Sequence, residues 1–509
     1  MNNNLYLQFQ PHLQQQKTFI DTPEGKVYRY CDSMVLAQRL AGALSAAGIK
    51  KGDRVAVQTD KSPEAIMLYL ACLQLGAVYL PLNTAYTDAE ISYFLQDSEP
   101  TLYICRPEVF DEALAIARQC GVPQVESLGT DADGSLMQLV NRTEPMQEIA
   151  DVDADDLAAI LYTSGTTGRS KGAMLTHSNL GSNCRALAEC WHYSAEDHLL
   201  HALPIFHTHG LFVACNITLT VGASMTFLAK LDPEQLLDLM PRATVLMGVP
   251  TFYTRLLQSP RLNQTTVANM RLFVSGSAPL LAETHDEFRA RTGHAILERY
   301  GMTETNMNTS NPYQGDRKAG TVGLPLPGTE LRITNRENGA ILPHGETGMV
   351  ELRGPNIFKG YWRMPEKTKE EFRTDGFFIT GDLGKLDEHG YLQIVGRDKD
   401  LVISGGYNVY PKEIEQLIDE LPDICESAVI GVPHPDLGEG VTAVVVPKPG
   451  ATPDETEIRR HLNEQLARYK QPKCILLVES LPRNVMGKVQ KNQLRAQYKD
   501  LYLAEATTA

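Results

Sequence analysis

The chain has 509 residues, of which 43% are hydrophobic and 21% charged, a composition typical of folded globular proteins that excludes overall disorder. Its formal net charge of −15 argues against a protein that binds nucleic acid, because such binding depends on Lys and Arg neutralising phosphates. At roughly 150 residues per domain, the length predicts about three domains.

Cysteine usage and hydropathy indicate the compartment. The nine cysteines include no Cys-x-x-Cys pair, which favours reduced thiols and a cytoplasmic location over a disulfide framework or a zinc cluster. The N-terminal residues lack the basic and apolar regions of a secretory signal. The longest nearly apolar stretch, 70–82, is too short to span a bilayer, so we expect no membrane association.

Apolar runs of strand length alternate with helical patterns through most of the chain. The segment 62–76 is expected to be an amphipathic helix that ends at Gly76. This alternation predicts an α/β fold with parallel sheets, whose ligands gather at the carboxyl ends of the strands. The expected strands are 53–60, 77–83, 101–105, 156–165, 243–250 and 271–279.

The pattern changes near residue 321, where short strands separated by turn residues predict a β-rich subdomain. A further boundary is expected at 396–400. Beyond it, a compact unit combines both kinds of element. Its expected helices are 411–421, 453–469 and a final C-terminal helix, and its expected strands are 426–433, 439–447 and 473–482.

The strongest functional signal is TSGTTGRSKG at 163–172, directly after a buried strand. Its glycines let the backbone approach an anion, its hydroxyl groups donate hydrogen bonds, and Lys171 adds a positive charge. A flexible Ser/Thr/Gly connector is the structural alternative, but this density of donors at the end of a buried strand favours a phosphate site. The loop is not a Walker A motif, because Gly172, and not Ser or Thr, follows Lys171.

The same loop resembles the phosphate-loop signature of the acyl-adenylate-forming superfamily, which includes acyl-CoA synthetases, peptide-synthetase adenylation domains and beetle luciferases. Further segments resemble the other motifs of the superfamily in the same order, so that the resemblance covers essentially the whole chain. They are LPIFHTHG (203–210), SGSAPL (275–280), YGMTE (300–304), TGD (380–382), GRDKDLVISGGYNVYP (396–411) and PRNVMGKVQK (482–491).

The resemblance implies an adenylate-forming enzyme fold. The large N-terminal AMP-binding domain, 1–397, would contain two parallel-type sheets with helices and a β-rich part at about 321–397. A hinge at 398–400 would join it to a small, mobile α+β lid domain, 401–509. The implied reaction uses ATP, Mg2+ and CoA: a carboxylate attacks the α-phosphate of ATP and expels pyrophosphate, and the CoA thiol then attacks the acyl-adenylate.

The resemblance also assigns the ATP site. Glu304 would bind Mg2+ together with Thr166, and Thr303 would contact the α-phosphate, although a Thr-Glu pair alone is also typical of a helix N-terminus. Asp382 would accept hydrogen bonds from the ribose hydroxyls, an Asx turn being the structural alternative. The implied ATP-binding residues are Thr163, Ser164, Gly165, Thr166, Thr167, Gly168, Lys171, Ser277, Ala278, Pro279, Tyr300, Gly301, Met302, Asp382 and Arg397.

Three further residues are assigned to the C-terminal part. By resemblance, Lys488 bridges the carboxylate and the α-phosphate and catalyses adenylation only. The alternative is one more cation on a basic surface, since 468–499 contains eight Lys or Arg and one Glu. Lys399 lies at the family's hinge, and Gly406 would line the tunnel for the pantetheine arm of CoA. Lys488 is also a candidate target of a protein acyltransferase, which would remove its charge.

The acyl pocket decides the substrate. His207 would gate this pocket, whereas a zinc site with His209 lacks a third ligand at a suitable spacing. Arg255, expected near the start of a helix, and Ser277 would bind a second carboxylate, and Met302 would cap the pocket. For an average helix, a snorkelling arginine would be the preferred interpretation.

Within the superfamily the sequence is most similar to malonyl-CoA synthetases, which implies malonate or methylmalonate as the acid. The alternatives are a synthetase for another short carboxylic acid, an adenylation enzyme that loads a carrier protein, and a catalytically inactive nucleotide sensor. The expected partners are therefore small molecules, namely malonate, ATP and CoA. The oligomeric state stays open.

Overall fold

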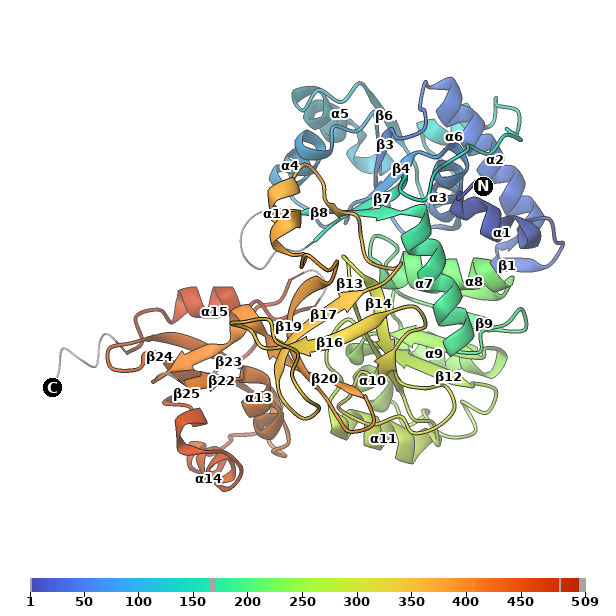
Figure 1. Ribbon diagram of the computed structural model, residues 1–509. Helices are drawn as coiled ribbons and strands as arrows, with labels where there is room; N and C mark the ends of the chain where they lie inside the picture. Colours follow the sequence, from blue (N-terminus) through green and yellow to red (C-terminus); the bar gives the residue numbers. More distant parts are fainter. Residues whose placement is uncertain (1, 164–169, 406, 485–486, 503–509) are drawn as a thin grey trace. The chain divides into compact units, whose positions relative to one another are not determined.

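The computed structural model describes residues 2–163, 170–405, 407–484 and 487–502, and it divides into two compact units (Figure 1). The first unit comprises Met1–Glu330 and Leu352–Phe378, and the second comprises Leu331–Glu351 and Ile379–Ala509. The second unit thus groups part of the expected β-rich subdomain with the C-terminal residues. The boundary expected at 398–400 stays a prediction.

A seven-stranded sheet forms the N-terminal half of the first unit. Its five strands β7-β4-β3-β5-β6 are parallel, as expected, and their apolar runs are buried. Two antiparallel strands, β8 and β18, extend one edge. In sheet order the strands are β18 (Gly360–Tyr361), β8 (Gly172–Thr176), β7 (Leu157–Tyr162), β4 (Val78–Pro81), β3 (Arg54–Gln58), β5 (Leu102–Cys105) and β6 (Gln124–Ser127).

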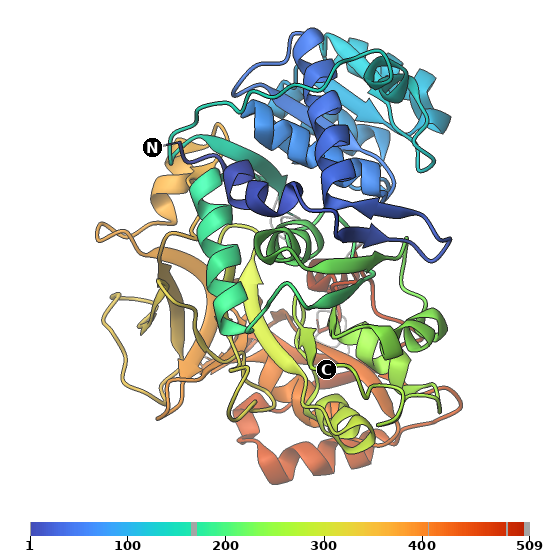
Figure 2. The ribbon, with the colours of Figure 1, turned by 90° about the vertical axis from the view of Figure 1, so that its right-hand side faces the viewer.

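Helix α3 (Pro63–Leu75) shows how the sequence sets local structure. The Ser62 side chain caps its N-terminus, Pro63 occupies its first turn, and Gly76 ends it with a φ of 67°, a left-handed conformation that glycine adopts without strain. Every residue of α3 is buried, so it is a core helix and not the amphipathic helix expected. It packs with α1 (Leu5–Leu13) and α2 (Tyr30–Ala46), the blue helices of Figure 2.

A nine-stranded sheet forms the other half of the first unit. Its central strands β13-β12-β11-β9-β10-β1 are parallel, which confirms the second parallel-type sheet, and β14, β15 and β2 add antiparallel edges. In sheet order the strands are β15 (Leu324–Pro325), β14 (Asn306–Ser310), β13 (Leu297–Met302), β12 (Leu272–Ser275), β11 (Val245–Gly248), β9 (His198–His201), β10 (Ser224–Phe227), β1 (Thr18–Asp21) and β2 (Val27–Arg29).

The remaining helices of the first unit connect and cover these strands. A π-helical turn, His209–Cys215, precedes α8 and was not expected from the sequence. These helices are α4 (Asp88–Ser98), α5 (Phe110–Gln119), α6 (Ser135–Val140), α7 (His177–Cys190), α8 (Asn216–Val221), α9 (Pro233–Leu239), α10 (Pro250–Leu257), α11 (Ala282–Thr292) and α12 (Pro365–Glu370).

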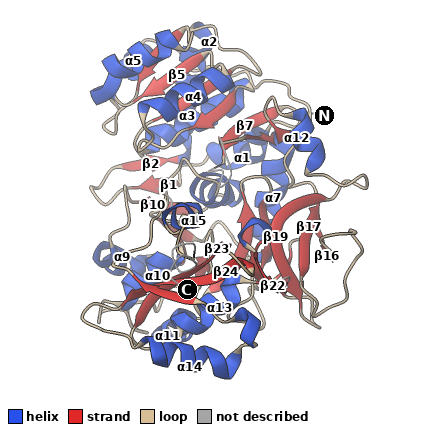
Figure 3. Ribbon diagram, turned by 90° about the vertical axis from the view of Figure 1, so that its left-hand side faces the viewer, coloured by secondary structure: helices blue, strands red, loops and turns tan. Residues whose placement is uncertain are grey.

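The second unit contains two smaller sheets. One is four-stranded, with β16 (Glu330–Thr334), β17 (Gly348–Arg353), β19 (Phe378–Leu386) and β20 (Leu392–Arg397). The other is built on the long antiparallel pair β23 and β24, which is drawn in red in Figure 3. Its strands are β22 (Tyr407–Val409), β21 (Val402–Ser404), β24 (Gly438–Pro447), β23 (Ile424–His434) and β25 (Cys474–Leu477).

Helices cover both faces of this five-stranded sheet. Apolar residues of α13 (Pro411–Asp419) and α14 (Glu455–Gln465) pack on one face, and those of α15 (Lys491–Gln497) pack on the other. This arrangement agrees with the α+β unit expected from the sequence. In the described parts of both units, no helix combines the length and the apolar character needed to cross a membrane.

Candidate functional site

Four neighbouring strands of the nine-stranded sheet, in the order β13-β12-β11-β9, carry three of the predicted motifs and the helix that contains Arg255 to one edge. The carboxyl ends of parallel strands meet at the same edge of a sheet, which is where ligands bind in such folds. The segment 203–210 follows β9, α10 follows β11, and 276–280 follows β12. The turn between β13 and β14 carries Thr303 and Glu304, so this pair does not begin a helix.

Residues expected to bind the acid lie along this edge. Arg255 lies in the last turn of α10, not near its start, and its side chain is exposed. Ser277 has a φ of 71°, a conformation that non-glycine residues rarely adopt, as is common where a site constrains the backbone. Ala278 and Pro279 follow it on the surface.

The two histidines of LPIFHTHG differ in their surroundings. His207 is half-buried, whereas His209 is buried and neither of its ring nitrogens has a hydrogen-bond partner in the described part of the chain. Burial, followed by the positive charge of Arg299, lowers the pKa of His209 well below its usual value, so this ring is neutral at pH 7. Among the described residues, no three His, Cys, Asp or Glu side chains are grouped as metal ligands.

Arg299 on β13 is a site residue that the sequence reasoning missed. It is 3% exposed, and its Nε and Nη2 atoms have no hydrogen-bond partner among the residues that the structure describes. A Cβ atom added to Gly276 would lie 2.4 Å from the Arg299 Cζ, so the guanidinium packs directly under the 276–280 segment. Burial lowers the pKa of Arg299 to about 9. The sequence offered no separate signal for it, because no strand was expected at 297–302.

Tyr300, Gly301 and Met302 follow Arg299 along β13, and all three are half-buried. The Tyr300 hydroxyl lies 4.0 Å from the Met302 sulfur, so the residue expected to contact adenine and the residue expected to cap the acyl pocket are in contact. Gly301 has no room for a side chain, because a Cβ atom there would lie 2.0 Å from the Asn306 carbonyl oxygen.

The predicted phosphate loop connects β7 to β8. The Thr163 N–H donates to the Lys171 carbonyl oxygen over 2.9 Å, which closes the loop at its base. Tyr93 on α4 donates to the Ser170 carbonyl oxygen over 2.7 Å. The expected phosphate ligands Ser164, Gly165, Thr166, Thr167 and Gly168 lie outside the described residues.

A network of polar side chains joins this loop to the β13–β14 turn. The Lys171 Nζ lies 3.2 Å from Glu371 and 4.0 Å from the centre of the Tyr361 ring. The Tyr361 hydroxyl lies 2.7 Å from a Glu371 carboxylate oxygen and 3.0 Å from a carboxylate oxygen of the buried Glu304. Tyr361 and Glu371 were not predicted, because only the fold brings them to residues up to 200 positions away.

The second unit contains the residues expected to contact ribose. Asp382 on β19 faces Arg397 on β20, and the Arg397 Nε lies 2.8 Å from the Asp382 carboxylate. Asp382 is 3% exposed, and its N–H donates to the Thr380 hydroxyl over 3.0 Å. Arg397 on the neighbouring strand therefore orients the carboxylate, and Thr380 orients the backbone that carries it.

The predicted hinge, 398–400, forms a single turn of 3-10 helix with an ion pair on each side of Lys399. Asp398 pairs with Arg336 over 2.5 Å, and Asp400 pairs with Arg495 over 2.8 Å. The expected CoA-tunnel residue Gly406 lies outside the described residues.

Lys488 is exposed and lies in a tight turn of the second unit. Its N–H donates to the Asn484 side chain over 2.9 Å, and its carbonyl oxygen accepts from the Asn484 N–H over 2.9 Å. Gly487 supplies a φ of 75°. Arg483, at the start of the turn, pairs with Glu426 of β23, which fixes the turn to the sheet.

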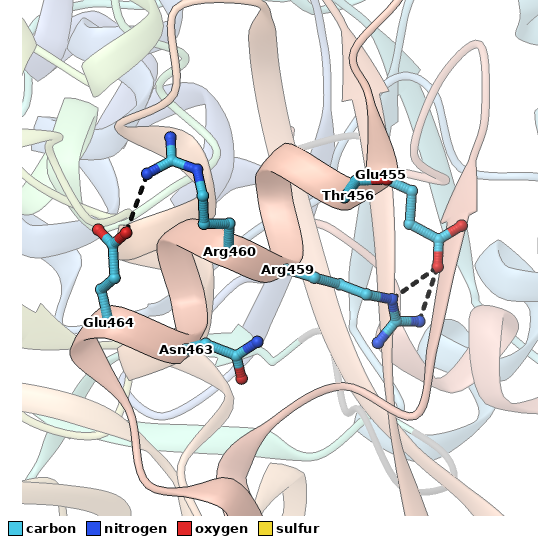
Figure 4. Close-up of a pocket in the computed structure, with 6 residues that line it drawn as sticks. All are labelled: Glu455, Thr456, Arg459, Arg460, Asn463 and Glu464. Carbon is cyan, nitrogen blue, oxygen red and sulfur yellow. Dashed lines mark hydrogen bonds and ion pairs between the residues drawn. The ribbon is translucent and has the colours of Figure 1, made fainter.

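One surface depression lies apart from these residues, and a second includes Tyr361 in its lining. One, of about 520 Å³, runs along α14, where Figure 4 shows Arg459 paired with Glu455 and Arg460 with Glu464. Such i,i+4 pairs are typical of a solvated helix face and indicate no site. The other, of about 590 Å³, lies beside α12 and includes Lys359 and Lys369 in its lining.

Comparison with known proteins agrees with this geometry. Residues 8–362 match the AMP-binding enzyme family, and residues 413–488 match the AMP-binding enzyme C-terminal domain. The chain therefore belongs to the AMP-binding enzyme family, as the sequence motifs predicted.

The chain is also similar to individual proteins, among them one solved structure and two ligases. The crystal structure of ATP-bound MatB from Rhodopseudomonas palustris is 60% identical, with a TM-score of 0.96 over 99% of this chain and 100% of that one. A malonate–CoA ligase from Arabidopsis thaliana is 36% identical, covering 88% of this chain and 78% of that protein. A mitochondrial malonate–CoA ligase from Mus musculus is 35% identical, covering 94% of this chain and 88% of that protein.

Proposed function

We propose that this protein is an AMP-forming malonate–CoA ligase, which activates malonate with ATP and transfers the malonyl group to CoA. The observation that carries the proposal is the buried Arg299 under the 276–280 segment, together with Arg255, which the resemblance assigns to the same pocket. A monocarboxylic acid has no second charge for these groups to bind, whereas malonate has one. The similarity to two malonate–CoA ligases supports the same substrate.

Arg299 also explains why a dianion suits this pocket. A buried guanidinium without an anionic partner is costly, and among the described residues none forms an ion pair with it. A carboxylate bound near the 276–280 segment would supply the missing charge. Ser277, presented by its unusual backbone conformation, would add a hydroxyl donor.

The proposed reaction consists of two nucleophilic substitution steps, and the C-terminal lid domain takes part in both. In the first, a malonate oxygen attacks the α-phosphorus of ATP and pyrophosphate leaves. In the second, the CoA sulfur attacks the acyl carbon, AMP leaves, and the thiol proton passes to solvent. The first step calls for charge neutralisation by Lys171 and Lys488, with Thr303 directed at the α-phosphate.

Mg2+ is proposed as the metal of the first step. The buried carboxylate of Glu304 fits this ion, because Mg2+ prefers oxygen ligands. When bound, the ion neutralises charge on the phosphates. CoA is proposed as the thiol substrate, with Gly406 allowing close approach of the pantetheine arm.

The proposal is tested by identifying the product. Purified protein with ATP, Mg2+ and CoA is offered malonate, methylmalonate, acetate, octanoate and benzoate in competition, and the thioesters are identified by mass spectrometry. We expect malonyl-CoA and AMP to dominate. A thioester of a monocarboxylic acid would contradict the pocket assignment, and accumulation of acyl-AMP would indicate a carrier protein as acceptor.

The hinge proposal makes a separate prediction. Proline fixes φ near −65°, so Lys399→Pro should leave adenylation intact and slow thioester formation, because the lid cannot turn between the two steps. We expect at least a tenfold loss of thioester formation, measured by single-turnover transfer from preformed malonyl-AMP. Unchanged transfer by the variant would exclude Lys399 as the hinge.

Two further assignments concern the modification of Lys488 in the cell and the location of the protein. The exposed position of Lys488 supports modification by a protein acyltransferase, which would remove the charge used in adenylation. A cytoplasmic location stays a prediction from the cysteine pattern.

A further inference from the structure

The phosphate-loop lysine already has an anionic partner in the first unit. Lys171 pairs with Glu371 at 3.2 Å, and both side chains are mostly shielded, with exposed fractions of 24% and 20%. Its ammonium group also lies over the Tyr361 ring. A lysine expected to bind phosphate is thus in contact with an anionic and an aromatic side chain of the protein.

Glu371 has enough other partners to release Lys171 without becoming an isolated charge. Lys367 on α12 lies 3.1 Å from the same carboxylate oxygen that contacts Lys171. The Tyr361 hydroxyl hydrogen-bonds the other carboxylate oxygen of Glu371. A carboxylate that keeps one cation and one hydrogen bond avoids the large cost of an unpaired buried charge.

Tyr361 connects Glu371 to the predicted metal ligand. Its hydroxyl lies within hydrogen-bond distance of both Glu371 and Glu304, and it has a single proton to donate. Its strand β18 pairs with β8, which follows the phosphate loop, through the register Tyr361–Ala173. Tyr361 is thus fixed to the edge of the seven-stranded sheet next to the loop of Lys171, and its hydroxyl group reaches Glu304 in the β13–β14 turn of the nine-stranded sheet.

We propose that the Glu371 carboxylate is the counter-anion of Lys171 and that the triphosphate of ATP displaces this carboxylate from the lysine. Tyr361 is then a positioning residue, whose hydroxyl group holds the Glu371 carboxylate close to that of Glu304. The proposal rests on the assignment of Lys171 to the phosphates in the proposed function. Glu371 thereby lowers the affinity for ATP and keeps Lys171 ordered between turnovers.

The counter-anion role of Glu371 is tested by whether its substitution raises or lowers the affinity for ATP. Glu371→Gln keeps the shape of the side chain, releases Lys171, and removes a negative charge next to an anionic ligand. We expect the Kd for ATP, measured by titration calorimetry with Mg2+ and without malonate or CoA, to fall about threefold or more. A raised Kd would overturn the proposal, since Glu371 would then only hold Lys171 toward the phosphates.

Two variants on α12 test the exchange of Glu371 for ATP at Lys171 without altering Glu371 itself. In Lys367→Met, Lys171 is the one cation paired with Glu371 among the described residues, so ATP should bind more weakly than to the natural protein. Lys369→Met removes the same charge from the same helix, although no ion pair with Glu371 is observed for it, and serves as the matched control. Equal affinities of these two variants for ATP would contradict the exchange, and thermal unfolding verifies that each variant is folded.

A double-mutant cycle separates this inference from the proposed function. In a Lys171→Gln background, Glu371→Gln should lose most of its effect on the Kd, because the competing partner is gone. Full retention of the effect would show that Glu371 acts by long-range repulsion and would overturn the counter-anion role. Failure of the natural protein to bind ATP would instead contradict the proposed function itself.

Discussion

Lys488→Ala should lower the rate of adenylation about 100-fold or more while leaving thioester formation from supplied malonyl-AMP within about twofold of its normal rate. The ammonium group would bridge the attacking carboxylate and the α-phosphate only while the new P–O bond forms. No such charge develops when the CoA sulfur attacks the acyl carbon. The two rates are measured separately, by pyrophosphate release with ATP and malonate, and by transfer from synthetic malonyl-AMP.

The turn that carries Lys488 makes this a clean experiment. Its described contacts are backbone hydrogen bonds, the hydrogen bond to the Asn484 side chain and the Arg483–Glu426 pair, and Gly487 supplies its positive φ. Lys473→Ala is the matched control, because Lys473 is an exposed lysine of the same basic segment outside the turn. Equal losses in both half-reactions, or an equal loss in the control, would contradict the assigned role.

Arg255→Leu should lower kcat/KM for malonate about 100-fold, because a bidentate contact between guanidinium and carboxylate contributes about 2–3 kcal/mol. The same change should leave acetate turnover unchanged or raise it, since acetate presents no second carboxylate. The ratio of the two kcat/KM values, measured in one competition reaction, therefore reports the pocket and not general damage. Arg255→Lys should recover part of the malonate activity.

The position of Arg255 permits a strict control. Because its side chain is exposed at the end of α10, the leucine variant should unfold at nearly the same temperature as the natural protein. Arg289→Leu removes the same charge from an exposed position on α11, one strand further along the sheet. An Arg255 variant that retains normal malonate turnover would exclude this arginine as the carboxylate partner.

Much of the fold could be predicted because its strands are local signals. The segments 156–165 and 271–279 are apolar runs that end in Gly- or Ser-rich turns, and they form β7 and β12 with ends shifted by only a few residues. The antiparallel strands β8 and β18 could not be found in this way. Glycine and tyrosine at 360–361 form a strand only because β8 offers an open edge.

The residues of the candidate site fall into the same two groups, those that the sequence indicates and those that only the fold brings together. Lys171 could be named because it lies in a short motif whose chemistry is visible in sequence, whereas Glu304 and Arg255 could be named only through the resemblance to the superfamily. Glu371 belongs to a charged stretch that resembles any solvated helix end, and its role depends on a contact 200 positions away. Arg299 is similar: only the position of its guanidinium under Gly276 distinguishes it from a strand residue that reaches the surface.

The ion pairs around Lys399 have a consequence for exchanging parts between relatives. Asp398 and its partner Arg336 both precede Lys399, whereas Asp400 and its partner Arg495 both follow it. A chain joined to a homologue at this one residue therefore inherits both pairs whole, each from a single parent. Recombination at Lys399 should yield folded hybrids, whereas a junction a few residues away on either side would separate an aspartate from its arginine.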